Sequence, residues 1–341
     1  MKYENTLRKL CRQPKLTIEQ IQSAFRKCNS IEVEVTASNI GRNGFSIQTD
    51  EGLCFVTERP IRYLNSRWGR VTGLQERMLD LAIPVPLYVG EGTLVKDIHR
   101  IQNSQKPLNE ANLWLHETFT SEIAAAYFNK YLCASESFSE YKTIIFESIE
   151  AYYLGLDHIA IMSLFPVFEA GLRNIQRKVL NKDPSNVSAA EFEKGLKELI
   201  LTWGRGRLSQ YVWHPGKGYN KQVEIDFFTH TNPQCDVINA FRLFFSGVLY
   251  KSSHRGGSLN GFNRHLVVHL LRNDFNEPSN YARIFLALTQ VTFIESLQNT
   301  NVPFSWRGVN EDDRKISNYM RTLTDQFFLP RRKILRGICD Y

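Results

Sequence analysis

The feature that most constrains the fold is a periodic run of apolar residues between positions 157 and 179. The run consists of Ile161, Phe165, Phe168, Leu172, Ile175 and Val179, at intervals of 4, 3, 4, 3 and 4 residues. Because an α-helix has about 3.6 residues per turn, these side chains share one face of a long helix, which must be buried against other helices. Asp157 can cap this helix, and Pro166 removes one backbone N–H within it, which predicts a bend.

Three further helices are predicted around this one. Apolar residues recur at helical spacing over 139–155, over 237–249 and from about Pro278 to Ile294. A polar stretch rich in Gly and Pro, residues 181–235, separates the second helix from the third. Four helices with one long insertion predict a four-helix bundle.

The N-terminal part follows another pattern. Thr17, followed three residues later by Gln20, forms a capping-box sequence and predicts a short helix. Apolar and polar residues then alternate over 31–36, and two short runs, 45–49 and 53–57, flank a turn sequence. Alternation with period two is typical of strands, so a hairpin inside a β-meander is predicted here.

These patterns together predict a mainly α protein with four parts. The parts are a small α+β domain with a β-meander over 1–110, a helical connector over 111–138, a helical bundle over 139–300 with its insertion at 181–235, and a basic C-terminal helical tail over 301–341.

Composition narrows the setting of the protein. Among 341 residues, no stretch free of Asp, Glu, Lys and Arg approaches the roughly 20 residues that a membrane-spanning helix needs. The first residues lack an apolar segment, so we expect no secretory signal, no membrane association and a cytoplasmic location. The six cysteines lie far apart and form no CxxC pair, which indicates reduced thiols. A net charge of +7 permits a polyanionic partner without requiring one.

The segment Asn263-Arg264-His265-Leu266-Val267-Val268-His269 carries the clearest chemical signal. Histidine exchanges protons near neutral pH, and the arginine guanidinium presents a planar, permanently charged fork to phosphate oxygens. RNA cleavage without a metal needs both abilities, because the 2′-hydroxyl loses a proton, the 5′-oxygen gains one, and charge builds on the phosphate. We therefore assign His269 as general base or acid and Arg264 as phosphate clamp.

This segment, lying between the third and fourth predicted helices, resembles the HEPN superfamily. Its RNA-cleaving members carry Arg, usually a polar residue next, a few further residues and His, which Arg264, His265 and His269 match. Members often have Gly after that His, where this chain has Leu270. The resemblance implies a HEPN-like four-helix bundle, a metal-independent endoribonuclease without cofactor, and a homodimer that brings two Arg/His sets into one cleft. It further suggests a toxin or antiphage-defence effector acting on cellular RNA.

Other residues are assigned supporting roles. Asn263 and His265 are expected to orient groups or contact RNA. Glu169 can hold a motif residue or pair with Arg173 four positions later, and the ordinary frequency of such pairs favours Arg173. Further basic candidates for RNA contact are His254, Arg255, Arg205, Arg207 and Lys217. The neighbouring aromatics Trp203, Tyr211 and Trp213 suit base stacking, although large aromatics more often build a core.

Several alternatives remain open at this level. His265 and His269, at i and i+4 of a helix, have a spacing that also binds metal, but no third ligand or HExxH signature accompanies them. The same residues can simply tie a loop to the bundle. A non-catalytic HEPN-like module for RNA or nucleotide binding or for dimerisation is the alternative function, and a helical signalling scaffold is a third. As an enzyme, the protein would need restraint by residues 1–110, by the insertion or by an unknown partner.

Overall fold

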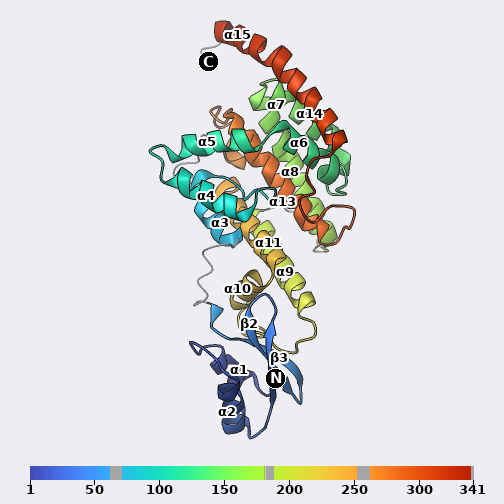
Figure 1. The fold of residues 1–341 in the computed structure, drawn as a ribbon. Coiled ribbons are helices and arrows are strands. Elements are labelled where there is room, and N and C mark those ends of the chain that lie inside the picture. The colour runs from blue at the N-terminus through green and yellow to red at the C-terminus, as the bar shows by residue number, and fades with distance from the viewer. Residues whose placement is uncertain (62–70, 180, 182–187, 252–261, 339–341) are drawn as a thin grey trace. The chain divides into compact units, whose positions relative to one another are not determined.

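A computed structural model describes residues 1–61, 71–179, 181, 188–251 and 262–338 of the chain (Figure 1). Within these residues the protein is mainly helical, and its sheet is a three-stranded antiparallel one close to the N-terminus. The predicted fold class, mainly α with an N-terminal β-meander, is confirmed at this level. None of the described helices is long and apolar enough to cross a membrane.

The chain divides into two compact units. The first combines residues 1–74 with residues 194–240, and the second combines residues 75–193 with residues 241–341. The chain passes from one unit to the other within three helices, α3 (Val71–Met78), α9 (Ala189–Arg207) and α11 (Pro233–Phe244).

The first unit consists of a small sheet and the helices around it. Its remaining elements are α1 (Glu4–Leu10), α2 (Ile18–Asn29), β1 (Glu34–Asn39), β2 (Asn43–Thr49), β3 (Gly52–Thr57) and α10 (Lys221–Thr231). The strands are antiparallel in the order β1-β2-β3, and the predicted hairpin joins β2 to β3. The predicted capping box also forms, because Thr17 and Gln20 each accept a hydrogen bond from the backbone N–H of the other.

Both faces of this sheet are covered, because the consecutive buried residues Cys54, Phe55 and Val56 of β3 point to opposite faces in turn. Ile47 and Val56 belong to a buried cluster with Phe25 of α2. The ring of Phe55, whose side chain points to the opposite face, lies 5.7 Å from the ring of Tyr211 and 6.2 Å from that of Phe227 in α10. Tyr211 and α10 come from the second stretch of the unit, so the sheet is completed from two distant parts of the sequence.

Residues 194–240 join this unit through backbone pairing as well. Phe55 N donates a hydrogen bond to Trp213 O at 2.9 Å, and Val212 N donates one to Leu53 O at 2.8 Å. The sequence analysis placed this stretch within an insertion, 181–235, of the helical bundle. The structure instead groups most of it with the N-terminal sheet, because hydrogen bonds between segments far apart in the chain leave no periodic pattern in the sequence.

The second unit is helical. Its elements are η2 (Leu79–Leu81), α4 (Glu91–Gln102), α5 (Pro107–Thr118), α6 (Ser121–Tyr127), η3 (Phe128–Leu132), η4 (Ser139–Tyr141), α7 (Lys142–Tyr153), α8 (Asp157–Val179), η5 (Phe245–Leu249), α12 (Arg264–Val268), α13 (Pro278–Ser296), α14 (Glu311–Leu323), η7 (Thr324–Phe328) and α15 (Leu329–Ile338). The four helices predicted from apolar spacing form as α7, α8, α11 continued by the π-helical η5, and α13.

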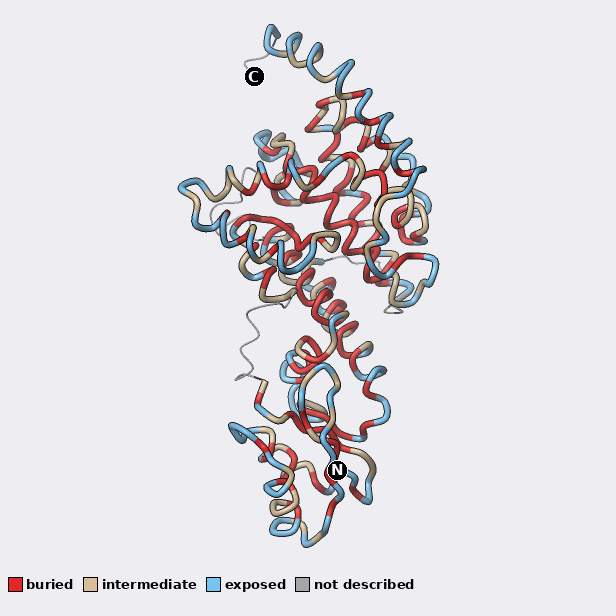
Figure 2. Tube along the Cα trace, viewed as in Figure 1, coloured by how far each residue is buried: buried red, intermediate tan, exposed pale blue. Residues whose placement is uncertain are grey.

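Helix α13 is the core element of the second unit. Every residue from Ser279 to Glu295 is buried, which Figure 2 shows as an almost continuous buried trace. Helix α8 packs against both α13 and α7. A helix buried on all sides must find internal partners for each of its polar side chains.

The polar side chains of α13 explain why residues 75–110 belong to this unit. Arg283 donates from Nε to Ala82 O at 3.1 Å and from Nη2 to Leu81 O at 3.2 Å. Gln290 Nε2 donates to Val85 O at 2.6 Å. The sequence pattern predicts residues 1–110 as one domain. The structure divides them near position 74, because the carbonyl groups of residues 81–85 are the acceptors that this buried helix needs.

The stretch predicted as a helical connector, 111–138, is helical but is part of the packed unit. Ala124, Ala125 and Ala126 of α6 are fully buried. Ser121 Oγ lies 2.7 Å from Ser317 Oγ of α14, so the small residues of α6 allow close approach of the C-terminal segment. The stretch beyond residue 301 is helical as predicted, in α14, η7 and α15.

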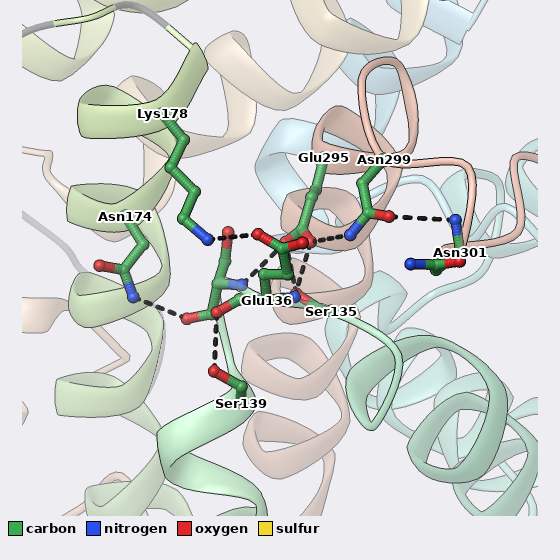
Figure 3. A network of polar contacts seen from close by, with 9 residues as sticks. Ser135, Glu136, Ser139, Asn174, Lys178, Glu295, Asn299 and Asn301 are labelled. Atoms are coloured by element: carbon green, nitrogen blue, oxygen red, sulfur yellow. Dashed lines mark hydrogen bonds and ion pairs between the residues drawn. The ribbon is translucent and has the colours of Figure 1, made fainter.

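Glu295, near the end of α13, fastens the turn before α7 (Figure 3). Its carboxylate accepts hydrogen bonds from Ser135 Oγ at 2.5 Å, Glu136 N at 2.7 Å, Ser137 N at 3.1 Å and Asn299 Nδ2 at 2.9 Å. Burial by itself raises the pKa of Glu295, but these hydrogen bonds outweigh it and hold the pKa below its ordinary value. The charged form of Glu295 therefore stabilises the fold.

We predict that Glu295→Gln lowers the free energy of unfolding by about 3 kcal/mol at pH 7, because buried donors lose a charged acceptor. The pKa is lower in the folded state, so the contribution is complete above the ordinary value of 4.5 and is lost as pH falls through the folded-state pKa. The difference between wild type and variant should therefore shrink below pH 4.5 in urea unfolding.

Glu136→Gln is the matched control. The Glu136 side chain is 59% exposed and pairs with Lys178 at the surface, so its loss should cost less than about 1 kcal/mol. Equal destabilisation by both substitutions would contradict the role assigned to Glu295.

Candidate functional site

The motif segment forms the short helix α12, which Asn263 caps. Asn263 Oδ1 accepts a hydrogen bond from His265 N at 2.9 Å, and Asn263 Nδ2 donates one to Lys251 O at 2.8 Å. Asn263 is only 2% exposed. Both ends of its amide are used inside the protein, so Asn263 fixes the start of α12 and joins it to the backbone at Lys251. Its predicted contact with RNA has no support in this geometry.

Arg264 is held by a buried carboxylate from α8. Its Nε donates to Glu169 Oε1 at 2.5 Å and its Nη2 donates to Glu169 Oε2 at 3.2 Å. Arg173 Nη2 also approaches Glu169, at the longer distance of 3.8 Å. The sequence favoured the pair within α8, whereas the structure brings Glu169 to both arginines and directs its hydrogen bonds to Arg264. Two anchored nitrogens fix the plane of the guanidinium.

Tyr250 is a further member of this cluster that the sequence analysis missed. Its hydroxyl donates to Glu169 Oε1 at 2.7 Å. Burial, and then the neighbouring charge of Glu169, raise the pKa of Tyr250, while the hydrogen bonds that Arg264 donates to Glu169 raise the pKa of Arg264. The cluster therefore contains one carboxylate and a permanently charged guanidinium. Tyr250 follows an apolar run without any motif around it, so no local pattern indicates its role.

The two motif histidines lie side by side at the surface. His265 and His269 are both exposed, and their ring centroids are 4.8 Å apart with an angle of 62° between the ring planes. Residues four positions apart lie on the same face of a helix, which accounts for this proximity. Across the described part of the chain, no group of three His, Cys, Asp or Glu side chains is arranged to hold a metal ion. No residue that the structure describes covers either ring. The pair is therefore accessible to a bound molecule.

Helix α12 ends in a Schellman motif. Leu271 N donates to Leu266 O at 3.0 Å, and Leu270 N donates to Val267 O at 3.1 Å. Leu270 accordingly has a positive φ of 49°, a left-handed conformation that favours glycine. This is the position at which HEPN proteins often have Gly. The turn forms here in spite of Leu270. This residue is 61% exposed, so its side chain does not have to fit into the core.

The remaining basic candidates lie elsewhere. Arg205 makes two hydrogen bonds to the buried Glu224, at 2.9 and 2.6 Å, and Lys217 Nζ donates to Val212 O at 2.7 Å. The Arg207 guanidinium lies 5.1 Å from the ring centroid of Trp203. These three residues belong to the first unit and their contacts are made within it. His254 and Arg255 lie outside the described residues.

Two of the three aromatics considered for base stacking are core residues. Tyr211 is 4% exposed and Trp213 is 3% exposed. Tyr211 Oη lies 3.1 Å from Ser46 Oγ on the sheet, which satisfies its polar end. Burial of these rings leaves no face on which a base can stack.

Comparisons with family models, with curated proteins and with solved structures give no match to this chain.

We predict that Leu270→Gly raises the free energy of unfolding by about 1 kcal/mol, because it relieves a left-handed conformation that costs a non-glycine residue energy. Urea or thermal unfolding of the purified variant measures the effect. Leu271→Gly is the matched control: Leu271 is similarly exposed, at 58%, but has no positive φ, so glycine there should be neutral or destabilising. Stabilisation by both changes, or by neither, would contradict the assignment.

Proposed function

We propose that this protein is a metal-independent endoribonuclease of the HEPN type. In this proposal α7, α8, residues 241–249 at the end of α11 and in η5, and α13 form the HEPN-like bundle, and α12 lies between its third and fourth helices in the sequence. The observation that carries the proposal is the arrangement on α12 itself. Arg264 is oriented by Glu169 in the protein, while His269, five residues later, is exposed beside His265.

The chemistry follows from these positions. The 2′-hydroxyl of RNA loses its proton to a histidine and attacks the adjacent phosphorus, and the 5′-oxygen leaves with a proton. The products are a 2′,3′-cyclic phosphate and a 5′-hydroxyl. His269 supplies general base or acid catalysis, and the free edge of the Arg264 guanidinium stabilises the charge on the phosphate oxygens. The Arg264 side chain is 27% exposed, which leaves part of its fork open to a ligand.

A homodimer completes the proposed site. One protomer offers a single Arg264 and a single His269 as base or acid, whereas the reaction needs a base and an acid at the same phosphate. Leu270 and Leu271 support pairing near the motif, since two exposed leucines adjoin His269 and are 61% and 58% exposed. A second copy packed over these leucines brings two sets of catalytic groups together.

The biological role proposed with this activity is that of a toxin or an antiphage-defence effector that damages cellular RNA. Induced expression of the wild type should then arrest growth, and expression of His269→Ala should not.

We predict that the purified protein cleaves total RNA or defined tRNAs in the presence of EDTA and leaves 2′,3′-cyclic phosphate ends. His269→Ala should reduce the cleavage rate by about 100-fold or more, because proton transfer is lost. Arg264→Ala should reduce it at least as much, and Arg264→Lys should also fail, since lysine keeps the charge but lacks the planar fork. Gel and mass analysis of the RNA products measures all of these effects.

His99→Ala is the control for the histidine change, because His99 lies on α4 and hydrogen-bonds Asn103 four residues later. It should cleave at the wild-type rate. Circular dichroism establishes that each variant is folded. Cleavage that stops with EDTA, or that persists in His269→Ala, would contradict the proposal.

We predict that Leu271→Asp converts the dimer to a monomer and abolishes cleavage, because a buried charge at an apolar contact prevents association. Light scattering coupled to size-exclusion chromatography measures the mass. Leu329→Asp is the control, since Leu329 is 63% exposed on α15 and distant in sequence from the motif. A monomeric wild type that still cleaves RNA would contradict the dimeric site.

One observation favours a second candidate, a non-catalytic module that binds RNA or a nucleotide. Two nitrogens of Arg264 already donate hydrogen bonds to Glu169. An arginine held in this way is better suited to binding an anion than to stabilising the large change in charge that occurs during a reaction. Under this function, filter binding of RNA survives in His269→Ala and no product forms in any variant.

A further inference from the structure

A cavity of about 900 Å³ lies in the second unit, and none of its lining residues belongs to α12. Its walls come from α5, α7, the starts of α8 and α13, and the C-terminal segment. Cavities of about 300–1,000 Å³ that combine apolar walls with a few polar groups are typical ligand sites. Phe119, Tyr152 and Phe328 supply aromatic surface here, and Asp157 and Glu277 supply two carboxylates.

Asp157 is the group that most needs a ligand. It is only 4% exposed, and its carboxylate accepts no hydrogen bond from any residue that the structure describes. Its nearest cation is Arg332, whose Nη2 lies 3.7 Å away, beyond hydrogen-bond distance. Burial raises the pKa of Asp157, which reflects the poor solvation of its charged form. A buried carboxylate gains most from a charged N–H donor that reaches it directly.

The cavity already accommodates a guanidinium, that of Arg332. The Cζ atom of Arg332 lies 4.5 Å from the centroid of the Phe328 ring, within the range of a cation–π interaction. The Arg332 side chain is 36% exposed, so its guanidinium lies at the edge of the cavity. Its neighbour Arg331 donates to Gly155 O at 2.5 Å and holds α15 beside the turn between α7 and α8.

Gly155 allows the C-terminal residues to approach the turn between α7 and α8 closely. It has a φ of +72°, and a Cβ at this position would lie 2.7 Å from Phe328 Cδ2. Only glycine allows both the left-handed turn and the contact with the Phe328 ring. The end of η7 therefore lies at the rim of the cavity.

We propose that this cavity binds an organic cation, namely a guanidinium or primary amine on a short apolar stem, and that the ligand displaces Arg332. The charged head lies against Asp157 and donates the hydrogen bonds that Arg332 does not make. The stem packs on the rings of Tyr152 and Phe119, which contact each other edge to face. This inference is independent of the proposed ribonuclease activity.

The charges of the cavity select this ligand class over the others. An anion would face both Asp157 and Glu277, with Arg332 as the single lining residue that is always positive. A neutral ligand that displaced Arg332 would leave Asp157 without a counter-charge in a buried position, which is costly. A cation that replaces Arg332 keeps the charge balance and improves the hydrogen bonding.

The test is isothermal titration calorimetry of the full chain with agmatine, a guanidinium on a four-carbon stem, and with N-acetyl-arginine methylamide, which stands for an arginine in a peptide. Butylurea, which has a planar head without charge, is the neutral comparison. We expect binding of agmatine or of the capped arginine, and none of butylurea. Binding of the first alone indicates a small-molecule ligand, and binding of the second alone indicates a basic peptide.

Variants then locate the site. Asp157→Asn should weaken agmatine binding about tenfold or more, because a charged acceptor is lost. Glu277→Gln, at a less buried carboxylate, should weaken it to a smaller extent and serves if Asp157→Asn fails to fold. Arg332→Ala should tighten binding severalfold by removing the internal competitor. Arg336→Ala, an exposed arginine on the same helix outside the cavity lining, should leave binding unchanged.

The proposal is overturned if neither cation binds, if butylurea binds as well as agmatine, or if folded Asp157→Asn and Glu277→Gln both bind agmatine like the wild type. Equal effects of Arg332→Ala and Arg336→Ala would likewise overturn the competition between Arg332 and the ligand.

Discussion

The complete burial of α13 is the constraint on which the second unit depends. A helix without an exposed face needs internal partners for its polar side chains, and the charged residues near its two ends, Arg283 and Glu295, find them. Arg283 donates to carbonyl groups near Ala82, and Glu295 accepts from the turn before α7. These bonds decide which distant segments assemble around the helix. The apolar surface drives burial, and the buried polar groups select a single arrangement of the segments.

The same principle shapes the candidate site. Glu169 is a buried carboxylate on α8 that needs donors, and Arg264 and Tyr250 provide them. This ion pair holds the short helix α12 against α8, while the two histidines on α12 stay exposed. The anchoring residue Arg264 and the exposed residues His265 and His269 thus lie within six positions of the chain. Such an arrangement suits a reactive group that must be oriented without being covered.

The cavity near Asp157 differs from the motif site in how its charges are balanced. At Glu169 the carboxylate receives short hydrogen bonds from two residues, whereas at Asp157 the nearest cation remains 3.7 Å away. The two buried carboxylates therefore have different roles in one unit. The first holds a structural element in place, and the second leaves a position for a cation from outside the cavity.

Local sequence patterns determined several of the elements of this protein. The sequence alone predicts the helix α8, the capping box at Thr17 and Gln20, and the β2–β3 hairpin. Each of these depends on contacts between residues that are close in the chain. The motif Arg264–His269 was also found, because its residue types and spacing are local. Only the tertiary structure decided that Trp213 completes the N-terminal sheet, that residues 75–110 join the helices, and that Tyr250 and Arg264 share Glu169. These pairings join backbone and side-chain groups far apart in the chain, and long-range hydrogen bonding leaves no periodic trace in a single sequence.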